Sequence, residues 1–160
     1  MSNTGTDPDW DMRSYIPRAI IINIATNDKF LDVNPALFNT TYVTFLKDKR
    51  TQYSSTEIFV MRTFGSYLEK ETMEAAQEGI TAGDKHLHYV NTTGWLVAGD
   101  YVDGVHPSDE GHRKVSARLK TEITPFLNAF TTIKAAPPKK SPTGKWKWFL
   151  GLVDLRGRIK

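Results

Sequence analysis

The chain has 160 residues, the usual length of a single domain. Apolar residues make up 39% of it and charged residues 24%, which excludes a fibrous repeat or disorder over the whole chain. It has no cysteine, so a disulfide scaffold, a thiolate zinc site and a cysteine nucleophile are excluded. No run approaches the ~18 apolar residues that a membrane-spanning helix needs, so we expect no membrane span.

The charge is distributed unevenly along the chain. Residues 1–130 hold 13 Lys and Arg against 17 Asp and Glu, whereas residues 131–160 hold 8 cations against Asp154 alone. The net charge of +3 therefore comes from the tail, and we expect no nucleic-acid partner for the acidic part. We predict one folded domain over 1–130 and a basic, disordered tail over 131–160, which is rich in Pro and Lys.

Strands and helices are predicted to alternate along the domain. The β-branched run Ala19–Ile24 is typical of a strand buried on both faces of a parallel sheet, and a polar loop over 25–29 should follow it. The expected elements after that are a helix over 35–50, a strand over 56–62, a helix over 67–78, a strand over 87–90, an irregular stretch over 91–107 and a helix over 108–130 that Ser108 caps. This order favours an α/β sandwich with a parallel sheet.

Parallel sheets bind ligands beyond the carboxyl ends of their strands, so the loops after residues 24 and 90 are the places to search for chemistry. The first loop carries Asn27 and Asp28. An amide there can donate a hydrogen bond to a developing oxyanion, although Asn and Asp also form ordinary turns.

The second loop has the sequence Asp103-Gly-Val-His106-Pro107. An Asp three residues before a His can hold the Nδ1–H group while Nε2 faces a substrate. The alternative is a simple turn with an exposed histidine before the last helix.

Together these two blocks resemble the SGNH (GDSL-type) ester hydrolases. Ala25-Thr26-Asn27-Asp28 stands where that family has Gly-x-Asn-Asp, and Asp103-Gly-Val-His106-Pro107 stands where it has Asp-x-x-His-Pro. The resemblance covers about residues 10–130 and is greatest to carbohydrate esterases and acetyl xylan esterases.

The resemblance implies a fold, three residue roles and a substrate class. The fold would be a flavodoxin-like three-layer sandwich. His106 would be the general base, Asp103 its orienting carboxylate and Asn27 an oxyanion-hole donor. The substrate would be a small ester or acetylated carbohydrate, cleaved through an acyl-serine without metal or other cofactor. The polar start of the chain is no secretory signal as it stands, but the family and the sequons at Asn39 and Asn91 suggest a secreted parent protein.

The family's nucleophile block, Gly-Asp-Ser, does not occur in this sequence. Gly99-Asp100 is followed by Tyr101, and Ser66, the remaining candidate, lies downstream of Asn27 where the family has its serine upstream. We therefore assign no nucleophile and interpret the chain as the C-terminal part of such an enzyme, inactive alone. Without the first two strands, the strand at 19–24 would be an uncharged sheet edge, prone to associate with itself or with a missing N-terminal half.

Two other interpretations stay open. The chain could be a non-catalytic remnant or sugar-binding module. It could also be a metal-dependent hydrolase, with ligands drawn from His86, His88, Asp103, His106 and His112.

Overall fold

The computed structural model describes residue 11 and residues 14–128, the side chain of residue 128 excepted. The predicted tail at 131–160 lies outside the described residues. Three parallel strands, β1 (Ala19–Ile22), β2 (Glu57–Met61) and β3 (Leu87–Val90), form one sheet in the order β1-β2-β3. No helix in this part of the chain is long and apolar enough to cross a membrane.

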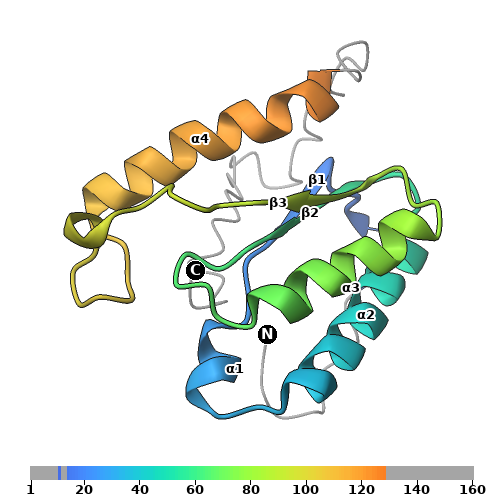
Figure 1. Cartoon of the computed structure of the whole chain (residues 1–160). Coiled ribbons are helices and arrows are strands. Elements are labelled where there is room, and N and C mark those ends of the chain that lie inside the picture. The colour runs from blue at the N-terminus through green and yellow to red at the C-terminus, as the bar shows by residue number, and fades with distance from the viewer. Residues whose placement is uncertain (1–10, 12–13, 129–160) are drawn as a thin grey trace, which may run out of the picture. The chain divides into compact units, whose positions relative to one another are not determined.

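Helices cover both faces of the sheet, as Figure 1 shows. On one face lie α2 (Pro35–Gln52) and α3 (Glu69–Thr81), and on the other lies α4 (Asp109–Asn128). The predicted α/β sandwich with a parallel sheet is therefore confirmed. The helix boundaries follow local signals: the Asn34 side chain accepts hydrogen bonds from the Ala36 and Leu37 amides at the start of α2, and Ser108 Oγ accepts one from Gly111 at the start of α4.

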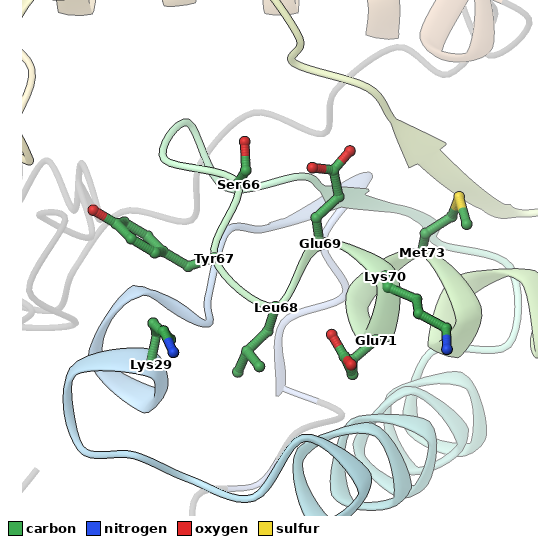
Figure 2. Close-up of a pocket in the computed structure, with 8 residues that line it drawn as sticks. All are labelled: Lys29, Ser66, Tyr67, Leu68, Glu69, Lys70, Glu71 and Met73. Atoms are coloured by element: carbon green, nitrogen blue, oxygen red, sulfur yellow. The ribbon is translucent and has the colours of Figure 1, made fainter.

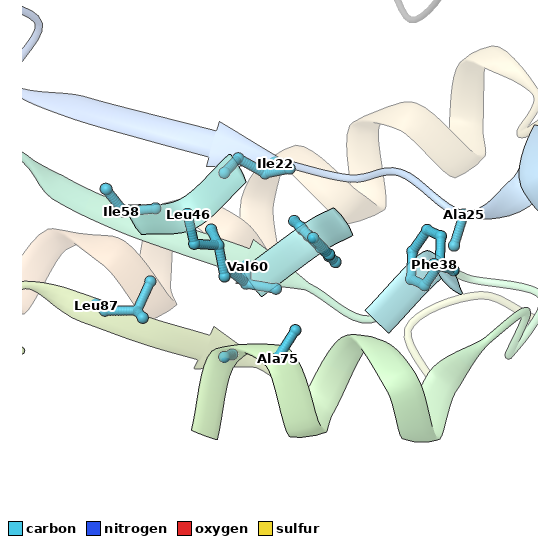
Figure 3. Packing of buried hydrophobic residues seen from close by; sticks show 10 residues of the cluster. Ile22, Ala25, Phe38, Leu46, Ile58, Val60, Ala75 and Leu87 are labelled. Atoms are coloured by element: carbon cyan, nitrogen blue, oxygen red, sulfur yellow. The ribbon is translucent and has the colours of Figure 1, made fainter. Parts of the chain in front are cut away.

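The alternation of side chains along the strands divides the core into two layers. The layer beneath α2 and α3, drawn in Figure 3, is aliphatic and aromatic; its members include Ile22, Phe38, Leu46, Ile58, Val60, Ala75 and Leu87. The layer beneath α4 is smaller and consists of Phe59, Met61, Val90 and Trp95, against which Val115, Leu119 and Ile123 pack. The central strand β2 is buried at all five positions.

The first strand differs from its prediction. We expected burial on both faces, but only Ile22 is fully buried in β1, and Ile21 is 45% exposed. The reason is position: β1 has a strand neighbour on one side only in the described sheet, and Ile21 lies on the face that α4 covers only in part. The strand also ends at Ile22, before Ile24.

Candidate functional site

The three segments that leave the carboxyl ends of the strands lie at the same edge of the sheet, since all three strands are parallel. They are the segment after β1, which contains the short helix α1 (Thr26–Phe30); the loop after β2, residues 62–68; and the long connection after β3, residues 91–108. The sequence-predicted residues Asn27, Asp103 and His106 all fall on these segments.

Asp103 and His106 form a pair in the connection after β3. Nδ1 of His106 lies 2.6 Å from Oδ2 of Asp103. The other carboxylate oxygen, Oδ1, accepts hydrogen bonds from the backbone amides of His106 at 2.7 Å and Val105 at 3.0 Å. The His106 amide, its imidazole and the Val105 amide together lower the pKa of Asp103 to about 2. The carboxylate is therefore ionised at neutral pH.

This pairing leaves the other ring nitrogen of His106 available. An ionised carboxylate only accepts hydrogen bonds, so the proton of a neutral imidazole sits on Nδ1 and Nε2 keeps its lone pair. The side chains are 74% exposed for His106 and 53% for Asp103. Nε2 makes no hydrogen bond to any described residue, and the arrangement can accept a proton from a group that approaches from solvent.

Short-range contacts close the loop that carries the pair. Tyr101 and Pro107 form an isolated antiparallel bridge, and the Val102 amide donates to the His106 carbonyl at 2.9 Å. The loop thus presents Asp103 and His106 on a turn between two fixed ends.

Asn27 lies on a short helix and not on the polar loop that we expected over 25–29. Ala25 adopts φ 106°, in the left-handed region, and the chain turns there into α1, with the Lys29 amide donating to the Ala25 carbonyl. A glycine adopts this conformation without steric cost, which gives a physical reason for a glycine at the matching position of the family block. The Asn27 side chain is exposed and makes no hydrogen bond within the described chain.

The loop after β2 contributes a buried cation that the sequence did not reveal. Arg62 is 7% exposed; its Nε lies 2.8 Å from Oε1 of Glu69, as an ion pair without the alignment of a hydrogen bond. Its Nη2 donates to Ser66 Oγ. The available signal was a charged residue directly after the buried apolar strand β2.

Ser66 therefore faces Arg62 and Glu69, and it has no contact with a histidine among the described residues. Beside it is a pocket of about 500 Å³, shown in Figure 2. The pocket is lined by Lys29, Ser66, Tyr67, Leu68, Glu69, Lys70, Glu71 and Met73.

The candidate ligands of the metal alternative do not form one cluster, because His86 and His88 lie at the opposite edge of the sheet from Asp103 and His106. Nδ1 of His86 and Nε2 of His88 both contact the buried carboxylate of Glu57, at 2.8 and 2.7 Å, near the start of β2 and β3. This is the amino edge of the sheet, opposite to the edge that carries His106. No group of three or more His, Cys, Asp or Glu side chains in the described residues is arranged to hold a metal ion.

The fold and these side chains define a layered α/β protein with a histidine–carboxylate pair at the carboxyl edge of its parallel sheet. No family model matches the chain. In sequence, the chain is 27% identical over 123 residues to the cellulase/esterase CelE of Acetivibrio thermocellus, a match that spans 71% of this chain and 15% of CelE.

Two solved structures have a similar fold. One is a family two carbohydrate esterase from Clostridium thermocellum in complex with cellohexaose, with a TM-score of 0.66 and 22% identity over 78% of this chain and 40% of that one. The other is an acetyl xylan esterase from the rumen bacterium Butyrivibrio proteoclasticus, with a TM-score of 0.62 and 20% identity over 79% of this chain and 41% of that one. The resemblance to carbohydrate esterases that the two sequence blocks predicted is confirmed.

Proposed function

We propose that this chain is the part of a serine ester hydrolase that supplies the general base and an oxyanion donor, and that the whole enzyme removes acetyl groups from carbohydrate. The observation that carries the proposal is the contact of 2.6 Å between Asp103 and His106 at the carboxyl edge of the sheet. The similarity to CelE supports the choice of an ester as substrate.

In the proposed reaction, Nε2 of His106 takes the proton from a serine hydroxyl as the serine oxygen attacks the ester carbonyl. Asp103 holds the imidazole by Nδ1 and stabilises the imidazolium that forms. The Asn27 amide donates a hydrogen bond to the carbonyl oxygen as it becomes negative. His106 then gives the proton to the sugar oxygen as its bond to the carbonyl carbon breaks, so that the sugar leaves with a free hydroxyl. In the second step water attacks the acyl-serine and loses a proton to His106, which returns a proton to the serine oxygen as acetate departs.

The serine would come from a Gly-Asp-Ser block, which this sequence lacks. The chain spans about 40% of the length of the solved structures that it resembles. We therefore propose that the chain alone does not hydrolyse esters, and that activity appears when such a block is joined upstream.

The test is a fusion in which the part of CelE that precedes the matched region is placed before residue 11, with acetate release from acetylated cello-oligosaccharides as the assay. His106→Ala should lower kcat by about 10³-fold or more, as removal of a triad base does elsewhere. His112→Ala is the matched control, because His112 is an exposed histidine on the first turns of α4 outside the pair. Full activity of the His106→Ala fusion would contradict the proposal.

A sugar-binding module without catalysis is the second candidate. The pocket beside Ser66 favours it, since Tyr67 offers an aromatic surface there and Glu69 and Lys70 offer polar groups. Binding of cello-oligosaccharides to the chain, measured by titration calorimetry, together with an inactive fusion, would favour a binding role over hydrolysis.

We also propose that the β1 edge pairs with another strand, either of a second copy or of an N-terminal half. Ile21 and Ile24 are exposed on or beside this edge, and Ala19–Ile22 carries no charge that would oppose pairing.

A further inference from the structure

The connection that carries the Asp103–His106 pair is fastened to α4 by a buried carboxylate outside the pair. Asp100, in the 3-10 turn η2 (Ala98–Asp100), is 5% exposed. Its Oδ1 accepts a hydrogen bond from Nζ of Lys114 on α4 at 2.5 Å, and its Oδ2 accepts one from the Val97 amide at 3.0 Å. These two donors lower the pKa of Asp100, so the buried group is an anion with a partner on each oxygen.

The backbone of Asp100 is fixed at the same place. Its carbonyl accepts a hydrogen bond from the Ser108 amide at 2.8 Å, where α4 begins. It also lies so close to Gly111 that a Cβ at that position would come within 2.4 Å of the oxygen. Helix and connection can approach this closely only because residue 111 has no side chain.

Asp100 therefore stands directly before the loop that presents the pair. The next residue, Tyr101, forms the bridge to Pro107 that closes this loop. Asp103 and His106 are exposed, and among the described residues their side chains form no hydrogen bond or ion pair outside the loop, so their place relative to the sheet depends on the loop's two ends. Figure 1 shows the connection passing from β3 to the first turn of α4.

We infer that Asp100, through its ion pair with Lys114, is a positioning residue for the Asp103–His106 pair. Its importance for catalysis rests on the proposed function, but its effect on the geometry of the pair does not. When the ion pair is lost, the end of the loop loosens from α4 and the Tyr101–Pro107 bridge opens part of the time. The hydrogen bond between Asp103 and Nδ1 of His106 is then formed for a smaller fraction of the time.

The test reads the tautomer of His106 in the full chain, from the ¹⁵N chemical shifts of the two ring nitrogens at a pH where the ring is neutral. In the wild type, the Nδ1–H form should be the major one, because Nδ1 faces the Asp103 carboxylate. In Asp100→Asn and Lys114→Met, the Nδ1–H form should become the minor one. Lys114→Arg should keep the wild-type ratio, because it retains the charge that pairs with Asp100.

Two further variants keep the test decisive. Gly111→Ala pushes the Asp100 carbonyl away from α4 without changing a charge, and it should move the tautomer ratio in the same direction even where Asp100→Asn fails to fold. Glu110→Gln removes an exposed ion pair with Arg113 on the same helix and should leave the ratio unchanged.

A wild-type ratio in Asp100→Asn and Gly111→Ala, with only a lower melting temperature, would overturn the inference and leave Asp100 a purely structural residue. The proposed function is tested separately, by acetate release from the fusions. If the ratio moves but acetate release by the corresponding fusions is unchanged, the positioning stands and the hydrolase mechanism fails.

Discussion

Two histidine–carboxylate contacts lie at opposite edges of the same sheet, and they differ in almost every physical respect. At the carboxyl edge, Asp103 and His106 are three residues apart and largely exposed. At the amino edge, Glu57 is buried and bonded to His86 and His88, which lie 29 and 31 residues further along the chain.

The second contact is part of the core. The His88 ring stacks on Phe59 with centroids 4.9 Å apart, and Phe126 of α4 lies 3.9 Å from it. Glu57 is thus buried beside a packed His88 ring, whereas both side chains of the Asp103–His106 pair are more than half exposed. The same kind of contact is therefore expected to contribute mainly to stability where its carboxylate is buried, and it is accessible from solvent where both side chains are exposed.

The largest effect on folding is expected from Glu57→Gln. In glutamine an NH2 group replaces one of the two carboxylate oxygens, so the negative charge and one of the two acceptors that face His86 and His88 are lost. We expect a loss of about 1–3 kcal/mol in the free energy of unfolding, measured by urea denaturation. Glu78→Gln, which breaks an exposed pair with Lys47, is the control and should change stability by less than about 0.5 kcal/mol. Equal effects of the two variants would contradict the structural role of Glu57.

The same contact predicts how stability depends on pH. Burial raises the pKa of Glu57, but hydrogen bonds from His88 and His86 outweigh it and hold the pKa below its ordinary value of 4.5. A carboxylate with a lowered pKa stabilises the folded state above its unfolded pKa, and this stabilisation is lost as the pH falls through the folded pKa. The stability difference between wild type and Glu57→Gln should therefore shrink below pH 4.5. A difference that stays constant down to pH 3 would be inconsistent with an ionised Glu57.

The exposed edge of β1 allows a further comparison, between an exposed apolar residue on the edge strand and one outside the sheet. Ile21→Lys places a charge on the edge strand and should shift the full chain from associated species towards monomer in sedimentation velocity. Leu31→Lys is the control, because Leu31 is also exposed but follows α1 outside the sheet. A wild-type chain that is monodisperse, monomeric and cooperatively folded would refute the pairing of this edge with a second copy.

Much of the fold was predictable, because its signals are local. The β-branched run that contains β1 and the helical spacing of α2 follow from residues a few positions apart. The Asp103–His106 contact was predictable for the same reason, since an i, i+3 spacing on a turn brings the two side chains together.

The contacts that were missed depend on strand register. Ile58 is paired with Leu87, and this register places the neighbouring Glu57 beside His86 and His88. The residues close to Glu57 in the sequence do not indicate this contact, because the histidines lie 29 and 31 residues further along the chain. Arg62 and Glu69 meet across the loop after β2, in which Ser66 and Leu68 have left-handed φ values of 60° and 46° that the sequence does not indicate. The helix at Asn27 was missed because it depends on the left-handed conformation of Ala25, a residue type that rarely adopts it.

The left-handed conformation of Ala25 predicts the smallest effect on the free energy of unfolding. Ala25→Gly relieves the backbone at φ 106° but removes one buried methyl group, so we expect a net gain of at most ~1 kcal/mol in unfolding free energy. Ala117→Gly, at an exposed site in the middle of α4, is the matched control and should lose ~1 kcal/mol. Chemical denaturation of both variants checks the sign, and destabilisation by Ala25→Gly as large as that of the control would contradict the strain at residue 25.

The measurement that tests the account most directly compares His106→Ala with His88→Ala in the active fusion, for both acetate release and melting temperature. We predict opposite losses: His106→Ala keeps its melting temperature and loses hydrolysis by about 10³-fold or more, whereas His88→Ala melts at a lower temperature but hydrolyses normally while folded. Loss of hydrolysis in folded His88→Ala, or normal hydrolysis in His106→Ala, would contradict the division of roles between the two edges of the sheet.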